Sequence, residues 1–456
     1  MTTWNEAGLE EQIGVWRGYL RRRSAIHSRD VDELEDHLRD QVTALVDAGL
    51  AHDEAFLVAV KRMGSLDALA REFAFEHSDR LWKQLVVGAD TSIDSARAAR
   101  TEAVVVVVLA VLAALTLKAA ELFGYPLFSD QMGFFARNIS LFVLPFLTGY
   151  FAWKRRLNRP MLAWLAGAFA AAIVLGNIFP FRPNGATEVL TGLHLPIALW
   201  LAVGIAYAGG QWWTGGRRMD FVRFSGELLI YYVLIACGGV VLTGFTMTMF
   251  AAIGLRADWF AERWLVPCGA LGGVIVAAWL VEAKQSVVEN MAPVLTRLFT
   301  PLFTLVLLAF LATMAWTGNA IDLEREVLIG FDLLLVLVLG LLLYAVSARD
   351  PQAHPDWFDV LQIVLLLTAL IVDIVALIAI AARISEFGFS PNKVAALGEN
   401  VILLVNLAWS LWLYVRFVRG HGQFAALERW QTAYLPVYAI WAAFVVGIFP
   451  PLFGYV

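Results

Sequence analysis

The chain has 456 residues, of which 60% are hydrophobic and only 16% are charged. Soluble proteins average about 25% charged residues, so this composition is typical of a membrane protein and excludes an ordinary soluble one. The formal net charge of −5 lies entirely in residues 1–100, where 18 Asp and Glu outnumber 13 Lys and Arg. An acidic segment of this kind does not suit the phosphate backbone, so we expect no nucleic-acid partner.

Residues 1–90 contain helical patterns without a long apolar run. Leu34, Leu38, Val42 and Leu45 recur at spacings of three and four and mark one apolar helix face. Helices of this length are not stable alone in water, so the segment predicts a small bundle of three or four helices. Because the first 25 residues contain no apolar signal sequence, we expect domain 1–90 in the cytosol, followed by a linker over residues 91–100.

One part of this domain is similar to a known module. The segment from Leu34 to Phe73 reads LEDHLRDQVTALVDAGLAHDEAFLVAVKRMGSLDALAREF. It resembles the permease prefix domain, also called the HAAS-type signalling region, which precedes bacterial membrane proteins and permease-like subunits. The resemblance implies a cytosolic regulatory or assembly module with a cytosolic protein partner, and it implies no chemistry.

Residues 101–456 contain eleven apolar runs of about 18–25 residues, each long enough to cross a hydrocarbon core of about 30 Å. They predict an all-α, polytopic membrane domain. With the N-terminus inside, the inner loops contain 13 Lys and Arg against 7 in the outer loops, which indicates a cytosolic N-terminus and an outside C-terminus. The predicted spans are 101–122, 134–153, 160–180, 188–209, 226–253, 264–284, 297–317, 327–347, 358–382, 396–418 and 433–455.

Several long stretches of this region look like the bacterial DUF4153 membrane family. Among them are FVRFSGELLIYY (221–232), FDLLLVLVLGLLLYAVSARD (331–350) and RISEFGFSPNKVAALGENVILLVNLAWS (383–410). The resemblance implies a multi-pass protein of the bacterial plasma membrane. It brings no assigned activity with it.

Polar residues within the spans are the strongest functional signal, because a charge at mid-bilayer costs about 2.5–3.5 kcal/mol. Gln362 and Asp373 are eleven residues apart and share a helix face, as do Glu399, Asn406 and Ser410. We expect a polar pocket or a proton or cation route open to the outside; alternatively, these groups are buried and paired and fix the helix register. The candidate residues are Asp332, Gln362, Asp373, Glu399, Asn406, Ser410 and Lys118.

A second group of charges is predicted at the cytosolic ends of the spans. Its members are Arg223, Glu227, Glu282, Lys284 and Arg297. They suggest either a structural charge network or a gate or docking surface for domain 1–90. Just before the last span, residues 422–432 have an amphipathic pattern that predicts a helix lying along the inner membrane surface.

Motifs of soluble enzymes are absent from the sequence. There is no P-loop, no HExxH and no GxSxG, so we expect no catalytic residues, no metal and no cofactor. We interpret His194, within the fourth span, as a helix-packing residue. Three functions stay open: permease-like transport of an ion or small solute, a membrane sensor that signals to cytosolic partners through residues 1–90, and a lipid-acting enzyme. The sequence does not indicate the oligomeric state.

Overall fold

The structure is a computed structural model, and it describes residues 13, 28–48, 50–62, 91–125, 132–213, 215–252, 258–283, 291–317 and 325–456. The chain divides into two compact units, Met1–Ala99 and Arg100–Val456. Each unit is described by itself below.

The first unit contains helices α2 (Ser28–Asp47) and α3 (His52–Arg62). Leu38, Val42 and Leu45 of α2 are buried against Ala55 and Phe56 of α3, so the apolar face predicted for this stretch is the face that packs. The other helices predicted for this domain fall on residues 1–27 and 63–90, which lie outside the described residues apart from Ile13. The predicted bundle of three or four helices therefore stays a prediction.

Eleven of the described helices are long and apolar enough to cross a membrane, which confirms the predicted multi-pass, all-α architecture. One span begins with the short helix α11 (Asp258–Phe260) and a π-helical turn at Ala261–Leu265, which lead into α12. The helices of the second unit are α6 (Thr91–Leu122, whose residues 91–99 belong to the first unit), α7 (Met132–Lys154), α8 (Arg159–Ile178), α9 (Ala186–Tyr207), α10 (Gly215–Ala252), α12 (Val266–Ala283), α14 (Met291–Thr317), α15 (Arg325–Ala348), α16 (Trp357–Phe387), α17 (Pro391–Val418) and α18 (Ala425–Leu452).

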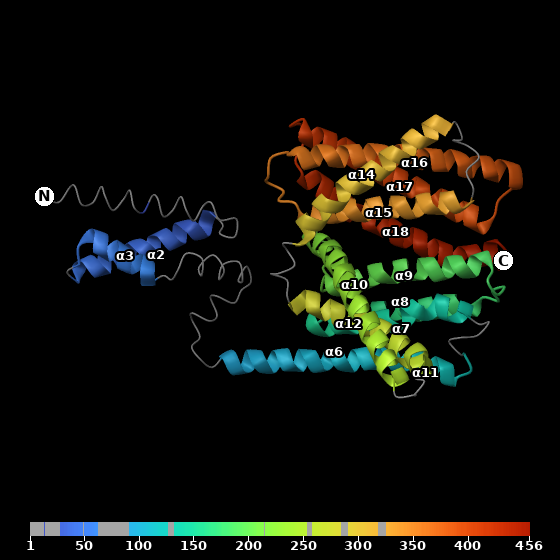
Figure 1. Cartoon of the computed structure of the whole chain (residues 1–456), viewed down its shortest axis with the longest axis horizontal. Helices are drawn as coiled ribbons and strands as arrows, with labels where there is room; N and C mark the ends of the chain where they lie inside the picture. Colours follow the sequence, from blue (N-terminus) through green and yellow to red (C-terminus); the bar gives the residue numbers. More distant parts are fainter. Residues whose placement is uncertain are drawn as a thin grey trace. The chain divides into compact units, whose positions relative to one another are not determined.

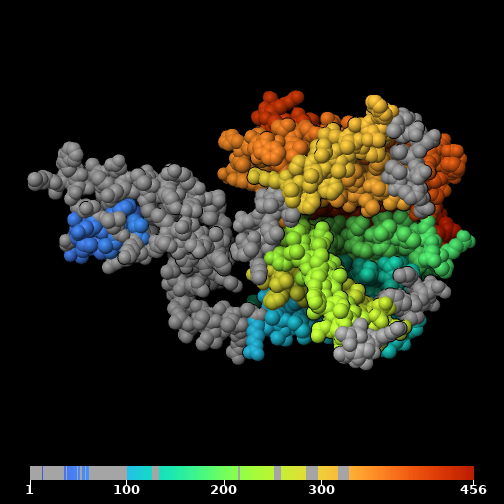
Figure 2. Space-filling model, in the orientation of Figure 1, coloured from blue at the N-terminus to red at the C-terminus, as the bar shows by residue number. Residues whose placement is uncertain are grey.

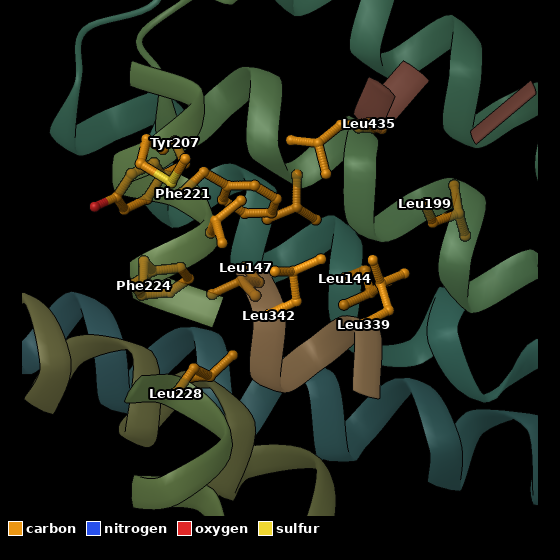
Figure 3. Packing of buried hydrophobic residues seen from close by; sticks show 14 of the residues in the cluster. Leu144, Leu147, Leu199, Tyr207, Phe221, Phe224, Leu228, Leu339, Leu342 and Leu435 are labelled. Carbon is orange, nitrogen blue, oxygen red and sulfur yellow. The ribbon is translucent and has the colours of Figure 1, made fainter. Parts of the chain in front are cut away.

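These helices form two groups that lie side by side (Figure 1). In the view shown, α14 to α17 lie above and α6 to α12 lie below, and the two groups meet where α9 packs along α18 and α10 packs against α15. Figure 3 shows apolar side chains from both groups pointing toward one another in one shared core. Labelled there are Leu144, Leu147, Leu199, Tyr207, Phe221, Phe224, Leu228, Leu339, Leu342 and Leu435.

The lipid-facing surface is apolar as well. Helix α10 shows this most clearly, because its second half is almost entirely exposed, including Val240, Leu242 and Phe245. In the space-filling view its yellow-green side chains lie on the surface of the membrane unit (Figure 2). Since water would not tolerate an apolar surface of this size, the surface fits a lipid bilayer.

Two predicted boundaries differ from the structure. Residues 91–100, predicted as a linker, are helical and form the first turns of α6. Residues 422–432 do not form a separate surface helix, because α18 starts at Ala425 and runs through to Leu452. Phe424 and Leu427 are buried, and the Phe424 ring packs edge-on against the rings of Tyr414 and Phe417. This apolar face therefore contacts protein instead of lipid.

Candidate functional site

Helices α16 and α17 form a hairpin that positions most of the predicted polar residues. Helix α16 begins with a capping box between Asp356 and Asp359 and ends at Gly388, whose φ of 76° is the left-handed conformation that favours glycine. Pro391 then starts α17 at a position where its missing N–H is not needed. Because the connection is short, the two helices pack antiparallel along their lengths, as Figure 1 shows.

Asp332 of α15 contacts this hairpin through Asn400 of α17. The Asn400 amide donates a hydrogen bond to Asp332 Oδ1 at 2.8 Å and another to the carbonyl of Ala396 at 2.8 Å. Asn400 is completely buried. Its side-chain oxygen has no hydrogen-bond partner within the described part of the chain, so this amide retains an unused acceptor beside a carboxylate.

Asp373 is the most unusual residue of the unit. It lies near the middle of α16 and is completely buried. Neither of its carboxylate oxygens has a hydrogen-bond partner among the residues that the structure describes, and the charge of Asp332 is close enough to act on it electrostatically. Buried polar groups are normally paired, and an unpaired carboxyl is expensive to bury.

Glu399, which precedes Asn400 on α17, pairs with His194 of α9. The distance from His194 Nε2 to Glu399 Oε1 is 2.6 Å, and His194 Nδ1 lies 2.8 Å from the carbonyl oxygen of Leu190. The His194 side chain is 5% exposed, whereas that of Glu399 is 33% exposed. The prediction of a packing role for His194 missed this contact. A histidine within a predicted span was the sequence signal for a polar contact. The partner could not be identified, because Glu399 lies 205 residues away in the sequence.

Asn406 and Ser410, predicted to share a site with Glu399, belong to a separate network between α17 and α18. Asn406 donates to the Gln431 side chain at 3.1 Å and to Tyr438, and its oxygen accepts from Trp430 at 2.9 Å. Ser410 accepts from the Gln431 amide at 2.6 Å. Asn406, Ser410 and Gln431 are completely buried. Their shared face with Glu399 is real, but Asn406 lies about 10 Å further along α17, where α18 supplies hydrogen-bond partners.

Gln362 and Lys118 are also away from Asp373. Gln362 lies about 16 Å from Asp373 along α16 and makes one long contact of 3.4 Å with the Thr300 hydroxyl of α14. Lys118 pairs with Glu121 at 3.0 Å, donates to the carbonyl of Arg263 and lies over the Trp264 ring. Its helix, α6, lies at the opposite side of the unit from α16 and α17 (Figure 1), so the predicted meeting of Lys118 with the acids is wrong.

The predicted network of cytosolic-end charges is resolved into separate contacts. Glu282 pairs with Lys154, the last residue of α7, at 3.2 Å and with Arg155, which follows α7, at 2.9 Å; Glu102 also binds Lys154. The sequence could not place the end of α7 beside α12.

Arg223 instead donates to the carbonyl of Ser347, and Glu227 is buried one turn further along α10. Arg297 lies 4.0 Å from Asp356 in an exposed pair. Lys284 lies outside the described residues. These contacts therefore stabilise separate helix junctions.

The structure also contains two ion pairs that the sequence analysis did not predict. Arg137 of α7 pairs with Glu188 of α9, and Arg349 pairs with the buried Asp359 at 3.0 Å. Among the described residues, no three His, Cys, Asp or Glu side chains come together in a group that could hold a metal ion.

Comparisons of the chain with known protein families, with curated proteins and with solved structures find no match. The resemblances to the DUF4153 family and to the permease prefix domain therefore stay predictions. The group formed by Asp332, Asp373, Glu399, Asn400 and His194, from helices α9, α15, α16 and α17, is called the acidic cluster below.

Proposed function

We propose that the protein is a permease-like transporter of an ion or small solute in the bacterial plasma membrane, regulated by its cytosolic domain 1–90. Its N-terminus would lie in the cytosol and its C-terminus outside. The observation that supports this proposal best is Asp373, a buried carboxyl group within a span without a hydrogen-bond partner in the described structure.

The contrast with other polar residues of the unit strengthens the argument. Asn406 and the Arg349–Asp359 pair make side-chain hydrogen bonds or ion pairs, whereas both carboxylate oxygens of Asp373 lack a partner in the described structure. Asp373 is not used in this way. An ionisable group within a span that lowers stability without fixing any contact is the pattern found at ion and proton sites of transporters.

A membrane sensor is the second candidate. The observation that favours it is the separate first unit, in which α2 and α3 bury their own apolar core. In this function the acidic cluster would register an ion or a membrane state without moving anything across.

Reconstitution into proteoliposomes tests the first proposal. Flux is followed with an internal pH dye and with dyes for Na⁺ and K⁺, in the wild type, Asp373→Asn and Glu399→Gln. The matched control is Glu386→Gln, the same chemical change at an exposed position of α16. We expect flux in the wild type and the control and loss of flux in both cluster variants.

Equal flux in all four proteins would show that the acids are structural. If no ion or solute tested is moved, and residues 1–90 bind a cytosolic partner, the sensor is favoured instead.

A further inference from the structure

We infer that the transported or coupling ion is the proton, that it reaches the acidic cluster from the end of the unit where the C-terminus lies, and that Asp373 is its innermost acceptor. This inference rests on the proposed transport function and names its ion. The residues involved are the His194–Glu399 pair, Asp332 with Asn400, and Asp373.

The His194–Glu399 pair shares one proton by geometry alone. Nδ1 of His194 faces the carbonyl oxygen of Leu190 at 2.8 Å, and since a carbonyl oxygen only accepts, Nδ1 must have the hydrogen. The contact of 2.6 Å between Nε2 and Glu399 Oε1 then needs a second hydrogen between the two atoms. The pair is therefore either imidazolium with carboxylate or imidazole with carboxylic acid, and both forms contain one exchangeable proton.

The pair also contains an accessible acid, Glu399. His194 and Glu399 each lie about two turns from the start of their helices. The start of α9 lies beside Val456 at the C-terminal end, because the Thr187 amide donates a hydrogen bond to the Val456 oxygen at 2.7 Å. Glu399 is one-third exposed and Asp332 is partly exposed, while His194, Asn400 and Asp373 are buried. A proton from this end of the unit therefore meets Glu399 or Asp332 before it reaches Asp373.

Asp332 connects the accessible pair to Asp373. Glu399 and Asn400 are consecutive on α17, so Glu399 faces α9 while the Asn400 amide holds Asp332 of α15. Asp332 lies within electrostatic range of both Glu399 and Asp373. The unused oxygen of Asn400 can accept a hydrogen bond from a water molecule or from a protonated carboxyl group in this space.

Asp373 has an acidic neighbour and no paired cation among the residues that the structure describes. Asp332 of α15 is the acidic neighbour close enough to interact with Asp373. Glu399 of α17 interacts with Asp332 and is paired with His194 of α9. Arg297 is the one charged residue in the described part of α14, and it lies exposed beside Asp356 at the other end of α16. A proton needs a single carboxyl oxygen, whereas Ca²⁺ takes six to eight oxygen ligands.

Beyond Asp373 the face of α16 is apolar. Leu366, Ala369 and Leu370 lie between Asp373 and Gln362 and are almost completely buried. The Thr368 hydroxyl in the same stretch donates to carbonyls of its own helix. The side chains on this face of α16 therefore offer a proton on Asp373 no hydrogen-bonding group before Gln362. We expect a carrier, whose helices move during transfer, rather than an open channel.

Infrared difference spectroscopy of the full-length protein in lipid tests this inference without relying on flux. A change of pH should produce a carbonyl stretch of protonated carboxylic acid that is lost in Asp373→Asn and retained in Glu386→Gln. Asp373→Glu, which keeps a carboxyl group, should shift the band instead of removing it, and it serves if the asparagine variant does not fold. In Glu399→Gln the band should form about 100-fold more slowly, because proton relay through a positioned acid is lost.

The outcomes separate the two proposals. A band unaffected by Asp373→Asn, or one suppressed by Na⁺ at constant pH, overturns the proton assignment even if the protein transports a cation. An Asp373 band in a protein that moves no ion overturns the transport function and leaves the proton site in place.

Discussion

Replacing Asp373 by leucine should stabilise the membrane unit, whereas replacing Asn406 by leucine should destabilise it. Both residues are completely buried polar residues of the α16–α17 hairpin. They differ in hydrogen bonding, because Asp373 has no hydrogen-bond partner within the described structure and Asn406 is fully paired. The comparison therefore separates a group kept for function from one kept for packing.

The expected magnitudes follow from the contacts. A buried polar group without a partner costs about 1–3 kcal/mol, and the extra volume of leucine takes back part of that gain. We expect Asp373→Leu to raise the free energy of unfolding by about 1 kcal/mol. Asn406 makes five side-chain hydrogen bonds with Ser410, Trp430, Gln431 and Tyr438. Each such hydrogen bond contributes about 0.6 kcal/mol within a membrane, so Asn406→Leu should lower the free energy of unfolding by about 3 kcal/mol.

Unfolding by sodium dodecyl sulfate in mixed micelles, followed by circular dichroism, measures both changes on the same scale. The fraction of denaturing detergent at the midpoint should rise for Asp373→Leu and fall for Asn406→Leu. If Asp373→Leu is destabilised as strongly as Asn406→Leu, Asp373 has structural partners, and both the transport proposal and the proton assignment lose their main support.

Three further predictions follow from single contacts. Arg349→Ala leaves Asp359 buried without its cation and should lower the stability by about 3–5 kcal/mol. Adding Asp359→Asn should restore much of this stability, and no restoration would show that the ion pair does not contribute to stability. Gly398→Ala places a Cβ atom in steric overlap with the Trp441 ring of α18 and should destabilise by about 1–3 kcal/mol in the same assay; an unchanged midpoint would contradict this packing. In a cysteine-free background, a membrane-impermeant maleimide should label Asn184→Cys in intact cells and Gly216→Cys only after permeabilisation, and the reverse pattern would invert the proposed topology.

The spans were predictable because their signal is local. A run of about 20 apolar residues is long enough to cross a bilayer whatever surrounds it, and all eleven predicted spans correspond to helices of the structure. Span direction then places Asp332 and Glu399 in the same half of the unit, where Asn400 of α17 donates a hydrogen bond to Asp332. The helix ends were less certain: α6 begins ten residues before the predicted span start at residue 101, since its first turns are polar and outside the apolar run.

The neighbours of each helix were not predictable. An apolar helix face packs equally well against lipid and against another helix, so hydropathy does not say that α9 lies beside α17. The His194–Glu399 contact, the Lys118 contact with the Arg263 carbonyl and the Asn406 network all depend on such neighbours. Each joins residues from different spans, and single residues such as His194 therefore looked like packing residues.

The two polar groups of the hairpin also explain how the fold tolerates an unpaired acid. The Asn406 network stabilises by about 3 kcal/mol and the unpaired Asp373 costs about 1–3 kcal/mol, so one approximately offsets the other within the same pair of helices. Active sites commonly lower stability in this way, and the rest of the protein compensates. A variant with both Asp373→Leu and Asn406→Leu should therefore unfold at a midpoint between Asn406→Leu and the wild type. A double variant as unstable as Asn406→Leu alone would show that the buried carboxyl of Asp373 has no cost to offset.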